Sequence, residues 1–336
     1  SGLIDDVIFY DEYERKLSNA LKNIKTEDIN YSTLDDYVKY SNKKIIKSGE
    51  SKIAVVFAQG EIFYGEGGPN IIGQGIINEA LIKAREDDNI KAVVLRVNSP
   101  GGSALTSDII WREVELTKAI KPVVVSMGNV AASGGYYIAA GADIIFAEPT
   151  TITGSIGVFG TVPNVSELAK DIGINAEQVG TNANSVDYSL FEPMTETFRN
   201  QVQEGIEDTY ETFLERVSEG RNISMAQADS LAQGRVWSGT DAKRLGLVDE
   251  LGTLEDAIDA AADMVDLSSY GIKKYPKYKS GFERFMEDIG GASAKTKENI
   301  IREEIGAEFY SVLKEVRFVL EQKGIQARMP FTLNIK

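Results

Sequence analysis

The sequence predicts an α/β fold in which a largely parallel sheet is flanked by helices. Apolar runs such as "KIAVVFAQGEI" at 52–62 alternate along the chain with stretches of helical spacing such as "GQGIINEALIKAREDDNI" at 73–90. This alternation is typical of parallel sheets. In addition, three strand-like runs each end in a small-residue loop, at 98–103, 128–135 and 153–160. Parallel sheets bind ligands beyond the carboxyl ends of their strands, so we expect these loops to converge at one edge.

The composition of the 336 residues is that of an ordinary globular protein of one large or two smaller domains, with 43% hydrophobic and 26% charged residues. A formal net charge of −15 makes nucleic acid an unsuitable partner. The chain has neither cysteine nor histidine, which excludes disulfides, thiolate metal sites and a Ser-His-Asp triad within it. We predict no metal and no cofactor. No apolar run is long enough to span a membrane, and no signal peptide opens the chain.

The expected elements follow in chain order. An amphipathic helix covers Tyr10 to Ile24, and a polar connector leads to the first strand. The remaining core elements are a strand that runs into a glycine-rich loop at 91–103, a helix at 105–120, a strand, loop and small-residue helix at 121–143, a strand and loop at 144–160, a long helix at 195–221, two shorter helices at 224–233 and 239–246, and a closing segment at 247–265. A last helix is expected at 298–323.

A short internal echo bears on the domain organisation. "GLIDD" at 2–6 resembles "GLVDE" at 246–250, an offset of about one domain. The echo is either a chance recurrence of a common strand-turn signature or a true repeat. If it is a repeat, residues 1–50 are the tail of a preceding homologous domain plus a connector, in a piece of a longer protein. Residues 51–265 would form the main domain, and residues 266–336 a carboxyl-terminal helical extension.

The small-residue loops hold the candidate chemistry, and each also has a structural interpretation. Ser133 in "AASGGYY" is either a helix N-cap or a nucleophile beside the N–H of Gly134. "NSPGGS" at 98–103 is either a turn or a pair of glycine N–H groups facing a substrate carbonyl. Thr153 and Ser155 either form a turn or orient an amine. Together, the three loops contain the parts of one oxyanion hole.

These motifs resemble a known family. "RVNSPGGS", "VVVSMGNVAASGGYYIA", "TGSIGVFG" and "QGRVWSGTDAKRLGLVDELG" are similar to segments of signal peptide peptidase A (protease IV), a family of serine peptidases. The resemblance implies a ClpP/crotonase-like fold, a superhelix of repeated ββα units. It also implies a Ser-Lys dyad, in which a desolvated lysine amine activates the serine. Ser133 matches the nucleophile, Gly101, Gly102 and Gly134 match the oxyanion loops, and Ser155 matches a serine that orients the lysine.

The sequence departs from the short form of this family at the lysine. Alignment on "FEPMTE" at 191–196 puts Ser185 at the position of the lysine, and the chain has no lysine from Asp171 to Asp241. In the long form, an amino-terminal homologous domain supplies this lysine. We therefore expect this chain to carry the nucleophile and the oxyanion hole, to take its general base from such a domain, and to have little activity alone. The local lysines Lys118, Lys121 and Lys170 are weaker candidates for the base.

The resemblance also implies a substrate, a location and an assembly. The expected substrate is an apolar peptide such as a cleaved signal peptide, held near Val130, Tyr136, Ile156 and Phe159. Relatives act at the extracytoplasmic (periplasmic) face of the inner membrane as homo-oligomers, so the membrane anchor would lie outside this chain. Two alternatives remain open. The first is a crotonase-like acyl-CoA enzyme, which needs no serine nucleophile, and the second is a non-catalytic scaffold.

Overall fold

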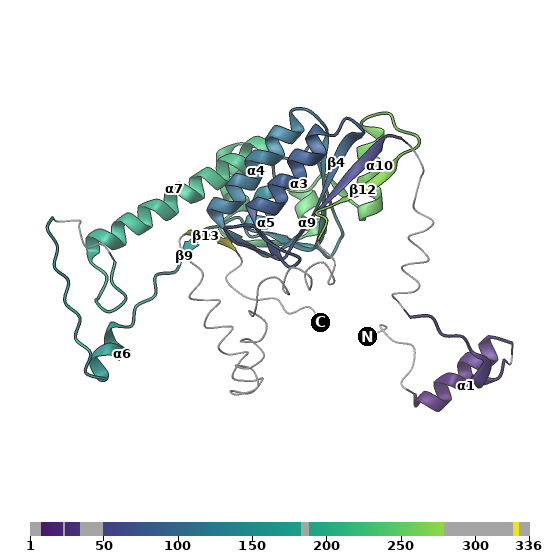
Figure 1. Ribbon diagram of the computed structural model, residues 1–336, viewed down its shortest axis with the longest axis horizontal. Coiled ribbons are helices and arrows are strands. Elements are labelled where there is room, and N and C mark those ends of the chain that lie inside the picture. The colour runs from purple at the N-terminus through teal and green to yellow at the C-terminus, as the bar shows by residue number, and fades with distance from the viewer. Residues whose placement is uncertain (1–7, 23, 34–49, 183–187, 279–324, 329–336) are drawn as a thin grey trace, which may run out of the picture. The chain divides into compact units, whose positions relative to one another are not determined.

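A computed structural model describes residues 8–22, 24–33, 50–182, 188–278 and 325–328 (Figure 1). The chain divides into two units, Ser1–Lys47 and Ser48–Lys336, and each is described by itself. In the first unit, helix α1 covers Tyr10–Ala20 and a 3-10 helix covers Thr26–Asp28. The predicted helix is confirmed but ends four residues early, because Lys22 adopts a left-handed φ of 64°.

The second unit alternates strands and helices, as the sequence predicts. Its elements are β1 (Lys52–Gln59), β2 (Glu61–Ile62), β3 (Ile71–Ile72), α3 (Gln74–Glu86), β4 (Ile90–Ser99), β5 (Gly101–Ser103), α4 (Ala104–Lys118), β6 (Val123–Ala132), α5 (Gly134–Ala139), β7 (Ile144–Ala147), β8 (Ile152–Gly154), β9 (Phe159–Gly160), α6 (Ser166–Asp171), α7 (Glu196–Arg221), α8 (Met225–Leu231), β10 (Val236–Ser238), α9 (Gly239–Arg244), β11 (Glu250–Leu251), α10 (Leu254–Asp263), β12 (Gly271–Tyr275) and β13 (Ile325–Arg328).

The strands form a large sheet and a small one. The large sheet has the order β10-β8-β6-β4-β1-β12, with β7 and β11 branching from β6, and only its β10–β8 pair is antiparallel. The small sheet has the order β3-β2-β5-β13-β9, in which β13 runs antiparallel to both of its neighbours. The predicted fold class, an α/β fold with a largely parallel sheet flanked by helices, is confirmed.

Two successive segments repeat the same ββα pattern. β1 and β4 lie in the large sheet, β2 and β5 follow them in the small sheet, and α3 and α4 complete the units. The sequence predicts one continuous strand at 52–62, which the structure breaks at Gly60. It also predicts a glycine-rich loop at 98–103, where the structure forms the short strand β5 after Pro100. Gly60 has a φ of 104°, and a Cβ there would lie 2.0 Å from the carbonyl oxygen of Asn70. The break lets the chain pass from one sheet to the other.

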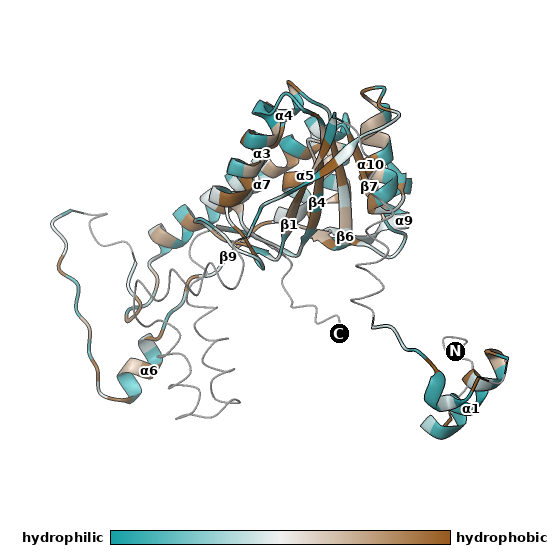
Figure 2. Ribbon diagram, turned by 45° about the vertical axis from the view of Figure 1, so that its right-hand side comes forward, coloured by the Kyte–Doolittle hydropathy of each residue, from teal (hydrophilic) through white to brown (hydrophobic). Residues whose placement is uncertain are grey.

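Both faces of the large sheet are buried, because alternate residues of each strand point to opposite sides. Ile53 and Val55 of β1 pack with α10 through Ala257 and Ala261, which are fully buried. The alternate residues of the same strands, which point to the opposite face, join the larger core with side chains of α3, α4, α5 and α7. The sheet strands are accordingly the most apolar elements in Figure 2, where they lie between more hydrophilic helix surfaces.

The described part of the region from residue 266 to 336 contains strands. β12 pairs with β1, and β13 pairs with β5 and β9, so both belong to the sheets of the core. The helix expected at 298–323 lies outside the described residues, and the division at residue 265 stays a prediction.

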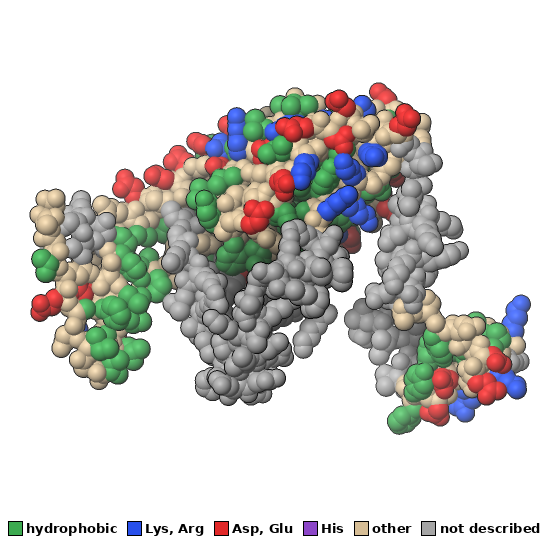
Figure 3. All heavy atoms as spheres, in the orientation of Figure 1, with side chains coloured by type: hydrophobic (Ala, Val, Ile, Leu, Met, Phe, Trp, Pro, Cys, Tyr) green, Lys and Arg blue, Asp and Glu red, His purple; other side chains and the backbone are tan. Residues whose placement is uncertain are grey.

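The surface carries the excess of acidic residues. Figure 3 shows acidic side chains along the outer face of α7, where Glu204, Asp208, Glu211, Glu215 and Glu219 are exposed. Their spacing of three to four residues places them on one stripe of the helix, opposite the buried Phe213 and Val217. No helix in the described ranges has both the length and the apolar character needed to cross a membrane.

Candidate active site

Ser133 occupies a sharp turn between β6 and α5. Its backbone has φ 54° and ψ −118°, a combination that L-residues adopt only at a cost in energy. Such strain persists where the surrounding structure enforces it, and it is concentrated at functional sites. A strained strand-to-helix turn is also how other hydrolase folds present a nucleophilic serine.

The backbone of Ser133 is held on both sides. Its N–H donates to Gly154 O at 2.8 Å, and its carbonyl accepts the N–H of Tyr137 at 2.8 Å. The hydroxyl donates to Gly157 O at a long 3.4 Å and caps none of the described N–H groups of α5. The N-cap interpretation is therefore wrong for this serine. Its side chain keeps a weak bond that an incoming base can replace.

Glycines follow Ser133 because neighbouring groups approach the backbone closely. A Cβ on Gly134 would lie 2.6 Å from Ser107 Oγ and 2.9 Å from Ala327 O. A Cβ on Gly135 would lie 2.7 Å from Ser99 O. Gly134 is also the first residue of α5, where the backbone N–H has no acceptor within the helix. The turn thus places a serine hydroxyl and an N–H donor that has no acceptor within the helix on adjacent residues.

The elements on either side of the second loop lie against the same turn, because Ser99 at the end of β4 approaches Gly135 and Ser107 of α4 approaches Gly134. Gly101 and Gly102 have φ values of 101° and 156°, and a Cβ on Gly102 would lie only 2.0 Å from Ile62 O. The N–H of Gly101 donates to Ser99 Oγ at 3.2 Å. The loop with the two glycines therefore lies beside the Ser133 turn, as expected for loops that converge at one edge of the sheet, and its oxyanion role stays a prediction.

The third loop joins the site through its main chain. The carbonyl oxygens of Gly154 and Gly157 accept the two hydrogen bonds that Ser133 donates. Ser155, which lies between these glycines, has a left-handed φ of 48°. The Ser155 N–H donates to Arg235 O at 2.7 Å. Thr153 is turned toward the sheet, where its hydroxyl donates to Ala131 O at 2.7 Å. Thr153 is thus a structural hydroxyl, whereas the Ser155 side chain lines a hollow.

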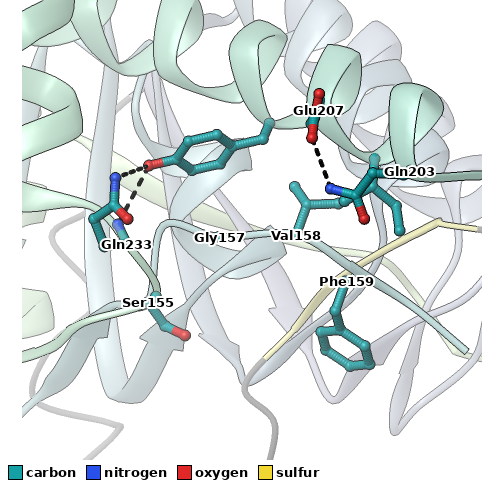
Figure 4. Close-up of a pocket in the computed structure, with 10 residues that line it drawn as sticks. Ser155, Gly157, Val158, Phe159, Gln203, Glu207 and Gln233 are labelled. Carbon is teal, nitrogen blue, oxygen red and sulfur yellow. Dashed lines mark hydrogen bonds between the residues drawn. The ribbon is translucent and has the colours of Figure 1, made fainter. Parts of the chain in front are cut away.

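The hollow beside Ser155 has a volume of about 520 Å³. Figure 4 shows Ser155 on one side and Gln203 and Glu207 of α7 on the other, with Gly157 and Val158 between them. Tyr210 completes the wall. Burial, together with the hydrogen bond that its hydroxyl donates to Asp229, raises the pKa of Tyr210 to about 12. The Tyr210 phenol is therefore uncharged near neutral pH, and Glu207 is the one acidic residue among the described residues that line the hollow.

Of the four side chains predicted to hold substrate, Phe159 lines this hollow. The structure places Tyr136 and Ile156 in the core, where both are fully buried and the Tyr136 hydroxyl donates to Leu247 O at 2.8 Å. Burial raises the pKa of Tyr136 well above its ordinary value, which keeps the phenol neutral. Val130 is buried against Ala132 and Ile152. These three side chains support the loops and do not line the hollow.

The local lysines are engaged away from the turn. Lys121 donates to the carbonyls of Ala84 and Asp87, and it precedes β6, whose ten residues span roughly 30 Å before Ser133. Lys118 donates to Gly141 O. Lys170 is an exposed residue of α6. Ser185, which aligns with the lysine of the short form, lies outside the described residues.

Three contributors to the site were not found from the sequence. Ser107, Gly157 and the strand β13 all lie within contact distance of Ser133 or Gly134. The glycine-rich loops carry local signals, but these three are brought in by the packing of α4, the path of the third loop and pairing with a segment far along the chain.

Comparison with known proteins gives consistent matches. Residues 115–268 match the model of peptidase family S49. The chain is 43% identical over 267 residues to Protease 4 of Haemophilus influenzae, covering 79% of this chain and 43% of that protein. It is 34% identical over 258 residues to a protein of Enterococcus faecium provisionally named signal peptide peptidase SppA, covering 76% of this chain and 73% of that protein. Among solved structures, a point mutant of ClpP1 from Listeria monocytogenes aligns with a TM-score of 0.40 and 16% identity, covering 61% of this chain and 94% of that one.

Proposed function

The chain belongs to peptidase family S49, and from this premise we propose that it is the nucleophile-bearing part of a serine peptidase that uses a Ser-Lys dyad. Ser133 attacks the scissile carbonyl in this proposal. The N–H groups of Gly101, Gly102 and Gly134 stabilise the oxyanion that forms. The chain spans less than half the length of the Haemophilus protein that it matches, so the activity proposed is that of the whole protein.

The observation that carries the proposal is the conformation of Ser133. A serine with only a structural role would cap α5 from an unstrained backbone. Ser133 instead holds a strained φ and directs its hydroxyl to Gly157 O, while the next residue is a glycine at the start of a helix. A nucleophile followed directly by an oxyanion donor is an arrangement that known acyl-transfer enzymes use.

The general base is a lysine from outside residues 51–265. Lys118 and Lys121 donate to carbonyls of other segments, Lys170 is exposed on α6, and the long segment from Asp171 to Asp241 contains no lysine. We assign the base to a preceding homologous domain, whose lysine amine would approach the hydroxyls of Ser133 and Ser155. Burial beside them would lower the pKa of that amine, so that its neutral form can accept the Ser133 proton.

The proposed substrate is an apolar peptide such as a signal peptide left after cleavage, and the proposed site of action is the extracytoplasmic face of the inner membrane.

Apolar side chains on the segment that includes α6 support a homo-oligomer in which a second copy covers them. Leu168 and Ile172 are 61% and 66% exposed, and Val179 is 93% exposed. Sedimentation of the purified protein tests this assembly, and a monomer at tens of micromolar would contradict it.

The decisive experiment measures peptidase activity on an apolar peptide in three preparations. These are the 336-residue chain, the same chain joined to the homologous domain that precedes it in its gene, and the joined protein carrying Ser133→Ala. We expect turnover only from the joined protein with Ser133 intact, with a loss of at least about 1000-fold in the variant. Ser107→Ala is the matched control, because it removes a nearby buried hydroxyl without removing the nucleophile.

Two results would overturn parts of the proposal. Strong Ser133-dependent turnover by the 336-residue chain alone would show that its base lies within it. Turnover by the joined protein that survives Ser133→Ala would remove Ser133 from the chemistry altogether. An inactive joined protein that is stabilised by coenzyme A esters would favour the acyl-CoA enzyme. An inactive joined protein that binds neither coenzyme A esters nor the apolar peptide would favour a scaffold.

A further inference from the structure

The strand β13 lies where a peptide would have to bind. β5 is paired with β2 on one side, through Ile62 and Gly102, and with β13 on the other. β13 also pairs with β9, so it fills the space between the two strands nearest the proposed oxyanion loops. A peptide that adds to these strands through main-chain hydrogen bonds needs the same edges.

The contacts of β13 reach the catalytic turn itself. Ala327 is paired with Gly102, and its carbonyl oxygen would lie 2.9 Å from a Cβ on Gly134. Both loops that carry the proposed oxyanion donors therefore touch the same residue of β13. Ala327 is fully buried, and Gln326 is 5% exposed.

Ser133 is itself 0% exposed in this arrangement. A nucleophile must come within bonding distance of a substrate carbonyl carbon, so whatever covers it has to move before a peptide is cut. β13 is seated against the adjacent Gly134, and it has only four residues. A short strand of this kind offers little apolar surface to hold it in place, whereas the strands of the large sheet bury both faces.

From these contacts we propose that residues 325–328 form an intramolecular pseudosubstrate, which occupies the peptide groove between β5 and β9 and must leave before a substrate binds. The inference rests on the proposed function, because it takes the groove beside Ser133 as the substrate site. It also specifies how a peptide binds. The peptide runs antiparallel to both strands, and it places a small side chain, like that of Ala327, opposite Gly102.

Competition by a tethered strand has a measurable consequence. A segment on the same chain competes at an effective concentration on the order of millimolar, so a free peptide at micromolar concentration is excluded. Weakening the tethered strand should increase binding of the free peptide without any new contact. Ala327→Asp is suited to this purpose, because a carboxylate at a fully buried position strongly disfavours docking of β13.

The experiment follows fluorescence anisotropy of a labelled peptide, KGIQARMP, which corresponds to residues 323–330. The protein is the full 336-residue chain with Ser133→Ala, so that no cleavage contributes. We expect Ala327→Asp to tighten binding at least about tenfold. A probe with Asp in place of its alanine should not bind to either protein.

Thermal unfolding of the same proteins separates a displaceable strand from a structural one. Ala327→Asp should melt within a few degrees of its parent, whereas the matched change Ala58→Asp in β1, also at a fully buried alanine, should abolish the cooperative transition. Unfolding of the Ala327→Asp variant, or a folded variant with no gain in probe binding, would overturn the inference.

The outcome is independent of peptidase activity. Tighter probe binding by the Ala327→Asp variant, together with no Ser133-dependent turnover by the joined protein, would contradict the proposed function. The inference that β13 occupies a peptide-binding groove would then stand. Ser133-dependent turnover with unchanged probe binding would contradict the pseudosubstrate alone.

Discussion

Two strand-to-helix turns of the core place a serine immediately before a helix, and they use it differently. Ser103 precedes α4 from an ordinary φ of −57°, and its hydroxyl accepts the N–H of Thr106 at 3.3 Å. Ser133 precedes α5 from a φ of 54°, and its hydroxyl donates to Gly157 O instead. In the first turn the left-handed positions are given to Gly101 and Gly102, which adopt them without a side-chain clash.

The difference distinguishes a turn shaped by backbone geometry from one shaped by chemistry. Glycine at position 133 would relieve the strained backbone, but it would remove the hydroxyl. A serine at this strained position fits the proposed role as nucleophile, whereas a capping role does not account for it. Replacing a glycine of the first turn by alanine should therefore destabilise the protein. Replacing the serine of the second turn by glycine should stabilise it.

The largest effect on stability should come from Gly102→Ala in the first turn. The new Cβ would meet Ile62 O at 2.0 Å, and the φ of 156° is unfavourable for alanine, so a backbone strand must shift. We expect a loss of at least about 3 kcal/mol in the free energy of unfolding, measured in urea. Gly68→Ala is the control, since its Cβ would have open space within 4 Å. Equal stability of the two variants would contradict the close packing of β5 on β2.

The second turn should be sensitive at Gly134, by a smaller amount. An alanine there would meet Ser107 Oγ at 2.6 Å and Ala327 O at 2.9 Å, for a cost of about 2 kcal/mol. Adding Ser107→Gly removes the nearer clash, so the double variant should recover part of the loss. Strictly additive costs would show that Ser107 does not limit the space at Gly134.

The comparison of the two turns also explains what the sequence could predict. The parallel sheet, the helices that flank it and the three small-residue loops are encoded by local patterns, namely apolar runs, helical spacing and glycine clusters. Ser133, Gly101, Gly102 and Gly134 could be proposed as site residues because each lies inside such a pattern. The break at Gly60 was missed because the apolar run that continues through it looks like one strand. The strand β5 was missed because "PGGS" is typical of a turn.

The remaining parts of the site depend on contacts distant in sequence. Tyr136 follows Ser133 closely, but the packing of α5 turns it toward Leu247, which no local pattern reveals. β13 is the four-residue segment "IQAR", too short to show a period, and its partners are β5 and β9 far earlier in the chain. The hollow beside Ser155 likewise forms only when α7 packs near the third loop.

Ser133→Gly should raise stability, which would sharpen the contrast between the turns. Glycine adopts a positive φ freely, but it also loses more conformational entropy than serine when the chain folds. The net gain in the free energy of unfolding should be about 1 kcal/mol. Ser133→Ala keeps the strained backbone and should not show this gain. Calorimetry of both variants distinguishes backbone strain from loss of the hydroxyl, and equal stabilities would contradict strain at this residue.

The smallest predicted effect compares the two serines directly. Ser103→Ala removes the N-cap of α4 and leaves the N–H of Thr106 without that acceptor, so it should cost about 1 kcal/mol. Ser133→Ala removes only the long 3.4 Å bond to Gly157 O, and its cost should stay below about 0.5 kcal/mol. Urea unfolding of both variants resolves this difference. A larger loss for Ser133→Ala would make the second turn a structural cap like the first, and the strain at Ser133 would then need another explanation.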